Sequence, residues 1–146
     1  MRILRSYLFV PGNRPDRFDK ALAAGADAVI VDLEDAVPPA EKVLARRHVA
    51  GWLSPEHPVI VRVNAFDSEW FRDDLAVCGR AGVAGVVLPK AERVDHVEAI
   101  VDRVDGTTLR PDGMHFGTET NHDAEPIAAR WLIDQLTARG RVPAPR

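Results

Sequence analysis

Residues 29–37 read Val-Ile-Val-Asp-Leu-Glu-Asp-Ala-Val, and this segment decides the fold of the chain. Its first three residues are β-branched, which is typical of a strand buried on both faces. Asp32, Glu34 and Asp35 follow, at a position where parallel α/β sheets bind ligands, the carboxyl end of a strand. Carboxylates this close repel one another unless a cation, a basic side chain or protons offset the charge. The simpler alternative is that Asp35 caps a following helix and Glu34 faces solvent.

The bulk composition excludes several classes of protein. The chain has 146 residues, which suits one domain with a sizeable core. A net charge of -3 and a pI near 5.9 do not indicate the excess of positive charge that is typical of nucleic-acid-binding proteins. Cys78 is the single cysteine, which excludes an internal disulfide and a cysteine-rich zinc site. With neither a signal peptide nor an apolar run of the roughly 20 residues that span a bilayer, we expect a soluble, cytoplasmic protein without a membrane partner.

Short apolar runs alternate with helical patterns along most of the chain. Strands are predicted at residues 6–10, 29–31, 59–63 and 83–88, and helices at residues 15–25, 39–51, 71–78 and 94–104. Repeated strand–helix units favour an α/β fold with a parallel sheet and right-handed crossovers.

Polar side chains follow each predicted strand. They are, in chain order, Asn13 and Arg14, then Asp32, Glu34 and Asp35, then Arg62 and Asn64, and finally Lys90 and Glu92. Because the carboxyl ends of parallel strands meet at one edge of a sheet, these residues indicate one functional face. Arg62 interrupts an apolar strand, where a buried charge needs a partner. It either pairs with Glu34 or Asp35 or holds a substrate carboxylate or phosphate, and Lys90 either joins this face or points into water.

Four blocks of the sequence resemble the amino-terminal half of the citrate lyase β-subunit-like proteins of the HpcH/HpaI aldolase superfamily. They are Ser6-Tyr-Leu-Phe-Val-Pro-Gly-Asn-Arg-Pro-Asp-Arg-Phe, Val31-Asp-Leu-Glu-Asp-Ala-Val, Val61-Arg-Val-Asn and Leu88-Pro-Lys-Ala-Glu. The resemblance implies a (β/α)₈ barrel of the TIM type. It also implies an enzyme that uses Mg²⁺ to cleave or form carbon–carbon bonds in 3-hydroxyacyl-CoA substrates such as citryl-CoA and malyl-CoA. These residue types suit a retro-aldol step, in which a metal stabilises the enolate and a cation holds the departing keto acid.

The resemblance further implies roles for individual basic and polar residues. Arg62 binds the substrate carboxylate and polarises its oxygen, and Asn64 belongs to the same substrate site. Lys90 joins the catalytic network of Arg62, and Arg14 lies on the rim near the acyl-CoA.

The carboxylates Asp32, Glu34 and Asp35 are implied to order metal-bound water and the basic side chains. In the superfamily, the two carboxylates that bind Mg²⁺ directly come from strands after the Leu-Pro-Lys-Ala-Glu block, and no such strands follow here. Asp32 and Glu34 are the predicted substitutes as metal ligands, because alternate residues of a strand share a face.

The residues after Val104 resemble a different family. Leu109-Arg-Pro-Asp-Gly-Met-His-Phe, followed by an amphipathic helix predicted at residues 124–139, resembles the last block of SGNH-type esterases. There an Asp-x-x-His pair, here Asp112 and His115, activates a serine, but the Gly-Asp-Ser nucleophile block is absent, and a turn before a packing helix is the alternative. We therefore divide the chain into residues 1–104, a half barrel, and residues 105–146, a loop and helix for which a separate origin is considered.

The predicted half barrel leaves its first and fourth strands as sheet edges, which invite pairing with another chain. Two copies could close an eight-stranded barrel, so we expect a homo-oligomer; the alternative is a flavodoxin-like layer with the last helix on one exposed face. The leading functional hypothesis is a Mg²⁺-dependent carbon–carbon lyase that acts on an acyl-CoA or a small keto or hydroxy acid. The alternatives are a non-catalytic scaffold, because half of the barrel is missing, and an SGNH-type esterase.

Overall fold

The computed structural model describes residues 4–101, 107–109 and 114–117. Four strands appear as predicted, namely β1 (Tyr7–Pro11), β2 (Ala28–Asp32), β3 (Val59–Arg62) and β4 (Val83–Val87). The helices between and after them are α1 (Phe18–Ala23), α2 (Lys42–Trp52), α3 (Phe71–Cys78) and α4 (Val94–Val101). Short 3-10 helices, η1 (Pro15–Arg17) and η2 (Pro39–Glu41), lead into α1 and α2, and each opens on a proline whose fixed φ suits a first helical position. Residues 102–104 of the predicted fourth helix lie outside the described residues.

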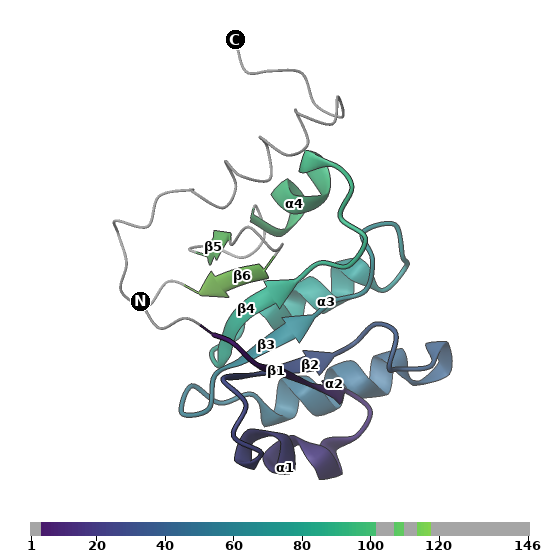
Figure 1. The fold of residues 1–146 in the computed structure, drawn as a ribbon. Coiled ribbons are helices and arrows are strands. Elements are labelled where there is room, and N and C mark those ends of the chain that lie inside the picture. Colours follow the sequence, from purple (N-terminus) through teal and green to yellow (C-terminus); the bar gives the residue numbers. More distant parts are fainter. Residues whose placement is uncertain (1–3, 102–106, 110–113, 118–146) are drawn as a thin grey trace.

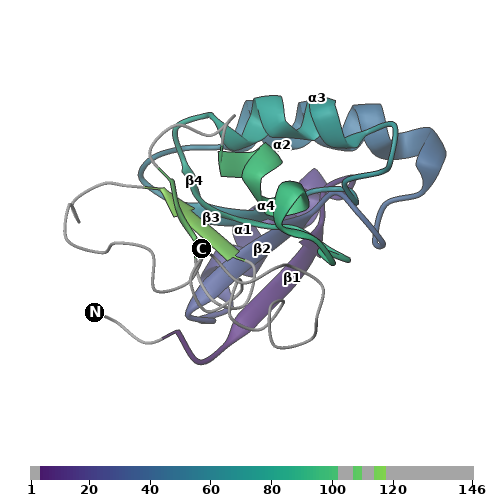
Figure 2. The same ribbon diagram turned by 90° about the horizontal axis from the view of Figure 1, so that it is seen from above.

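The strands β1 to β4 are parallel and stand in chain order (Figure 1), which confirms the α/β fold class. Right-handed crossovers in this order place the helices on one face, and α2 and α3 lie side by side over it (Figure 2). A flavodoxin-like layer needs a reversal in strand order, with helices on both faces. That alternative is therefore wrong, and the order is that of consecutive strands in a (β/α)₈ barrel.

The main core lies between the sheet and the helices. Val29 and Val31 of β2 point into it, and the helices contribute apolar side chains that include Phe18, Ala45, Val49, Phe71, Leu75 and Ile100. Ile30 and Ile60 belong to a second, smaller cluster. Successive side chains of a strand point to opposite faces, so the second cluster lies on the face away from the helices. The continuous apolar run in β2 thus reflects burial on both faces.

A hairpin that the sequence analysis did not predict extends the sheet. The strands β5 (Thr107–Leu109) and β6 (Met114–Gly117) are antiparallel, and β6 also pairs antiparallel with β4. The prediction that the fourth strand is an edge is therefore wrong, whereas β1 does lie at an edge of the sheet. Two short runs that contain apolar residues, on either side of Pro-Asp-Gly, are typical of a hairpin. The resemblance of this segment to an esterase block obscures that signal. Asp112 and the helix predicted at residues 124–139 lie outside the described residues.

No helix in the described part of the chain is long and apolar enough to span a membrane.

Candidate functional site

The register of β2 and β3 brings the predicted site residues together. Asp32 and Arg62 are directly paired across the two strands, two residues beyond the paired Ile30 and Ile60. Because side chains alternate, Asp32 and Arg62 share the face that the helices leave open, at its carboxyl end. Four side chains meet there, and we refer to Asp32, Glu34, Arg62 and Lys90 as the polar cluster.

Asp32 and Arg62 form a bidentate ion pair. Arg62 Nε donates to Asp32 Oδ1 at 2.8 Å, and Nη2 donates to Oδ2 at 2.6 Å. The backbone N–H groups of Glu34 and Ala36 donate to the same two oxygens at 2.8 and 3.0 Å. Burial raises the pKa of Asp32, but the hydrogen bonds from Arg62 and the two amides, with the positive charge, together hold it below its usual value. Asp32 is therefore a buried carboxylate that holds the Arg62 guanidinium by two hydrogen bonds.

Glu34 completes the polar cluster with two cations. Its Oε1 accepts a hydrogen bond from Lys90 Nζ at 2.9 Å, and its Oε2 lies 3.4 Å from Arg62 Nη1, an ion-pair distance. Oε2 is buried and has no hydrogen-bond partner among the described residues. The Phe9 ring covers the Arg62 guanidinium at 4.9 Å. Glu34 Oε2, beside Arg62 Nη1, is thus an acceptor of the cluster without a hydrogen-bond donor, and the exposed Lys90 ammonium has donors beyond the one that it uses on Glu34.

Lys90 reaches the cluster from the end of β4. Its side chain is mostly exposed, and the hydrogen bond with Glu34, followed by the charge of that carboxylate, raises its pKa. Its φ of 55° is in the left-handed region, which a non-glycine residue seldom adopts and which often occurs at functional sites. Lys90 thus contacts Glu34, and its part in catalysis stays a prediction.

Gly12 shows why the turn after β1 can approach this site. Its N–H donates to the carbonyl oxygen of Asp32 at 2.7 Å. A Cβ atom at this position would lie 2.9 Å from that oxygen and 2.9 Å from Leu33 Cδ2. Glycine is therefore needed for close approach of the two backbones.

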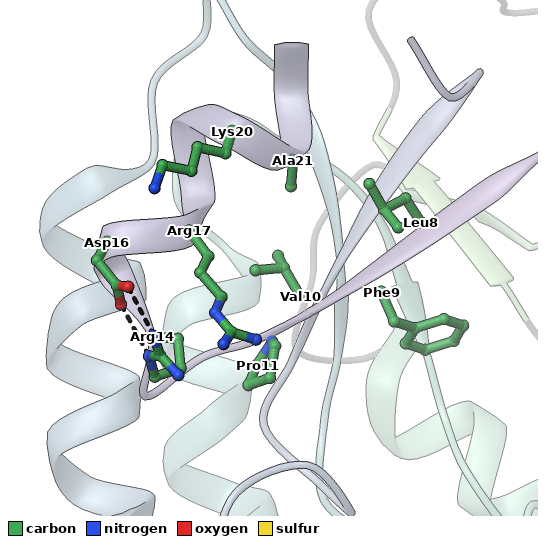
Figure 3. A pocket seen from close by; sticks show the side chains of 9 residues that line it. All are labelled: Leu8, Phe9, Val10, Pro11, Arg14, Asp16, Arg17, Lys20 and Ala21. Atoms are coloured by element: carbon green, nitrogen blue, oxygen red, sulfur yellow. Dashed lines mark hydrogen bonds and ion pairs between the residues drawn. The ribbon is translucent and has the colours of Figure 1, made fainter. Parts of the chain in front are cut away.

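Two predicted site residues are not members of the polar cluster. Asp35 is exposed to solvent, although its negative charge contributes to the raised pKa of Arg62 and of Lys90. Arg14 forms an exposed bidentate pair with Asp16 and lines an open groove of about 450 Å³ beside β1, together with Arg17 and Lys20 (Figure 3). Figure 3 shows Phe9, which covers Arg62, pointing to the other side of β1 from Val10. Arg14 thus lies on the far side of β1 from the polar cluster.

Asn64 does not take the place that was predicted for it. It is 3% exposed, its N–H and Nδ2 donate to Asp74 Oδ2 at 2.9 and 2.7 Å, and its Oδ1 accepts from Lys42 Nζ at 2.6 Å. Arg46 Nε donates to the other Asp74 oxygen at 2.9 Å. These contacts correct the predicted role in substrate binding, because the side chain is used inside the protein.

The sequence analysis missed Lys42, which is 6% exposed. Lys42, Ala45 and Val49 form the buried face of α2, at a helical spacing that could have identified the lysine. The apolar neighbours Val43 and Leu44 obscured this signal, since they look like the buried face but are 51% and 49% exposed.

The described residues do not form a direct Mg²⁺ site. Each oxygen of Asp32 already accepts two hydrogen bonds, so the predicted pair of ligands, Asp32 and Glu34, is reduced to the single free oxygen of Glu34. Within residues 4–101 and the hairpin strands, no three histidine, cysteine or carboxylate side chains are arranged to hold a metal ion. Mg²⁺ prefers six oxygen ligands, of which waters and substrate can supply several but not all.

The known proteins that this chain resembles include a malyl-CoA thioesterase and a citrate lyase subunit. A (3S)-malyl-CoA thioesterase of Cereibacter sphaeroides is 41% identical, over 90% of this chain and 54% of the relative. The citrate lyase subunit beta of Escherichia coli is 43% identical over 66% of this chain and 33% of that protein. The chain thus spans about half the length, or less, of these relatives. The match to the thioesterase must extend past residue 104, into the segment for which a separate origin was considered.

Solved structures agree with these relatives. The citrate lyase beta subunit from Mycobacterium tuberculosis, complexed with oxaloacetate and magnesium, has a TM-score of 0.59 and 41% identity over 66% of this chain and 43% of that one. Protein CitE from the same organism, in complex with magnesium, acetoacetate and coenzyme A, has a TM-score of 0.61 and 40% identity over 70% and 39% of the two chains. The profile of the HpcH/HpaI aldolase/citrate lyase family matches residues 5–111. With the strand order and the polar cluster described above, this match establishes that the chain belongs to the HpcH/HpaI aldolase/citrate lyase family.

Proposed function

We propose that this chain supplies the carboxylate-binding half of a carbon–carbon lyase that acts on a 3-hydroxyacyl-CoA of the citryl-CoA or malyl-CoA class. The observation that carries the proposal is the polar cluster, in which Arg62 is held in a fixed orientation on the open face of the sheet. A guanidinium that is fixed in advance binds a carboxylate without losing side-chain freedom at that moment. Family membership supports the same class of substrate.

Each residue of the polar cluster has a separate role in this proposal. Asp32 fixes Arg62, so that Arg62 Nη1 is left to contact the carboxylate or keto oxygen of the substrate. As a keto acid departs from the acyl-CoA, this positive charge stabilises the developing negative charge. Glu34, whose Oε2 lacks a hydrogen-bond partner among the described residues, accepts a hydrogen bond from the substrate or from an ordered water, while Lys90 Nζ donates to its Oε1.

We include magnesium as the cofactor because structures of two relatives contain it, one with oxaloacetate and one with acetoacetate. When bound, it supplies Lewis-acid stabilisation of an enolate. Within the described part of the chain, no group of three possible ligand side chains is arranged to hold it. Arg14, Arg17 and Lys20, in the groove beside β1, are proposed to face the negatively charged part of the acyl-CoA.

A thioesterase is the second candidate, because the match to the thioesterase relative covers 90% of the chain, compared with 66% for the E. coli citrate lyase subunit. The two reactions share a substrate but break different bonds. A lyase converts (3S)-malyl-CoA to acetyl-CoA and glyoxylate, whereas a thioesterase hydrolyses it to malate and free CoA.

Chromatography of the CoA products separates these candidates. The chain is incubated with (3S)-malyl-CoA and millimolar Mg²⁺, beside Arg62→Met and the control Arg93→Met, whose exposed pair with Asp95 lies outside the cluster. Acetyl-CoA formed by the parent and the control but not by Arg62→Met supports the lyase, and free CoA supports the thioesterase. No product, together with no thermal stabilisation by oxaloacetate and Mg²⁺, leaves the non-catalytic scaffold.

Self-association is also part of the proposal. β1 lies at the edge of the sheet, and an edge strand can pair with a second copy. Light scattering after size exclusion tests this, with a monomeric mass as the contrary result. A cytoplasmic location stays a prediction from the sequence.

A further inference from the structure

We propose that Lys42 is a positioning residue for the polar cluster, holding the ends of β2 and β3 in the arrangement that presents Glu34 and Arg62. The functional consequence rests on the proposed function, whereas the positioning itself can be tested without it.

The contacts of the Lys42 ammonium carry the argument. Its Nζ donates to the carbonyl oxygens of Leu33 and Glu34, at 2.7 and 2.6 Å. These two carbonyls belong to the turn that directly follows β2, so the lysine fixes two successive peptide planes. An ammonium group has three donors, and the third reaches Asn64 Oδ1 at 2.6 Å. All three protons therefore have partners in a buried site.

The geometry of the turn depends on these peptide planes. The N–H of Glu34 points back to Asp32 Oδ1, and the N–H of Ala36 points to Asp32 Oδ2. The Glu34 side chain then reaches Lys90 and Arg62 from the same turn. If the carbonyls of Leu33 and Glu34 lose their donor, the turn can rotate, and the hydrogen bonds to Asp32 weaken with it.

The contact with Asn64 extends the effect to β3. Asn64 stands two residues after Arg62, and Asp74 of α3 holds its backbone N–H and its side-chain amide. Lys42 thus joins the turn after β2 to the segment after β3, while it lies 5.3 Å from the centre of the Trp70 ring. No other described side chain donates to both segments in this way.

The charge of Lys42 also matters. Burial lowers its pKa, and the charges of Asp32, Asp74, Glu34 and Asp35 oppose this effect. A neutral amine has two donors and would leave one of the three buried acceptors without a partner, whereas a methionine at this position would leave all three without one.

Amide hydrogen exchange of Lys42→Met, Lys42→Arg and the control Arg47→Met tests the positioning. Arg47 is an exposed residue of the same helix, α2, with no part in these contacts and no place in the proposed binding site. In Lys42→Met we expect the amides of Glu34 and Ala36 to exchange at least ten-fold faster, while those of Val29 and Val59 keep their parent rates. We expect the same local change in Lys42→Arg, because a planar guanidinium cannot direct donors to three acceptors around one point. Unchanged rates at Glu34 and Ala36, or an equal rise at every amide, would overturn the proposal.

A measurement on the parent chain covers the case in which Lys42→Met does not fold. In ¹⁵N spectra of lysine side chains, the Lys42 ammonium should give a slowly exchanging signal, unlike the exposed Lys20 and Lys90. A Lys42 ammonium that exchanges as fast as these two would overturn the proposal. The functional consequence is measured separately: we expect oxaloacetate to bind Lys42→Met with a dissociation constant at least ten-fold higher than that of Arg47→Met. If the parent itself binds no oxaloacetate, the proposed function fails, and the exchange result still decides the role of Lys42.

Discussion

Removal of the Arg62 side chain should destabilise the fold, even though arginine is a charged residue on an open face. The variant Arg62→Met keeps the aliphatic part of the side chain and removes the guanidinium. Asp32, whose side chain is 1% exposed, then keeps only the amide hydrogen bonds from Glu34 and Ala36. A buried carboxylate without its cation is the dominant cost in this variant.

The expected loss can be worked from burial and geometry. Breaking a buried ion pair costs about 3–5 kcal/mol, and we take the lower end, because 21% of the Arg62 side chain is exposed. With a urea slope of about 1.5 kcal/mol/M, a loss of about 3 kcal/mol lowers the midpoint by about 2 M. Urea unfolding at pH 7, followed by circular dichroism, measures this shift.

Two controls make the result specific. Arg93→Met removes an arginine from an exposed pair and should leave the midpoint at the parent value. The double variant Asp32→Leu with Arg62→Met should recover part of the loss, because it leaves no buried charge without a partner. A midpoint for Arg62→Met within about 0.3 M of the parent would refute the reasoning, since the pair would then contribute almost nothing to stability.

Three further predictions concern stability. Gly12→Ala should lower the free energy of unfolding by about 1–3 kcal/mol, because its Cβ would lie 2.9 Å from the Asp32 carbonyl oxygen. Gly51→Ala should raise it by up to about 1 kcal/mol, because Gly51 lies in a helix with open space around it. Equal melting temperatures of the two variants would contradict this. Asp74→Ala should lose about 3 kcal/mol in urea unfolding, because it leaves Arg46 and Asn64 without their shared acceptor, and a loss below about 1 kcal/mol would count against the buried network. Since the folded-state pKa of Asp32 is lowered, its contribution is fully present above the unfolded pKa of about 4 and is lost as pH falls through the lower folded value. The melting temperature of the parent should therefore drop below pH 4, and a flat profile from pH 5 to pH 2 would contradict the assignment.

The partner of Arg62 shows where prediction from the sequence reached its limit. Glu34 or Asp35 was the expected partner, and Glu34 does lie within ion-pair distance. The bidentate partner is Asp32, however, because the β2–β3 register sets these two residues directly opposite each other. Register depends on how two distant strands align, and spacing along the chain does not specify it.

Asn64 and Lys42 show the same limit for polar residues. Both belong to segments that the sequence placed correctly, at the end of a strand and in a helix. Whether a side chain at such a position faces a ligand or the interior depends on neighbouring segments. Asp74 of α3 accepts hydrogen bonds from Asn64 and from Arg46 of α2. Lys42 of α2 donates to Asn64, so these side chains are hydrogen-bonded to one another inside the protein.

The sequence by itself determined the strands and helices, because apolar periodicity, prolines and glycines are local signals. It also placed the charged residues at one end of a parallel sheet, because right-handed crossovers bring the carboxyl ends of the strands together. The folded structure was needed to show that Asp32 pairs with Arg62, that Lys42 donates a hydrogen bond to Asn64 in the interior, and that β6 pairs with the edge of β4. These features depend on contacts between residues far apart in the chain, where register and burial, and not residue type, select the partner of each polar group.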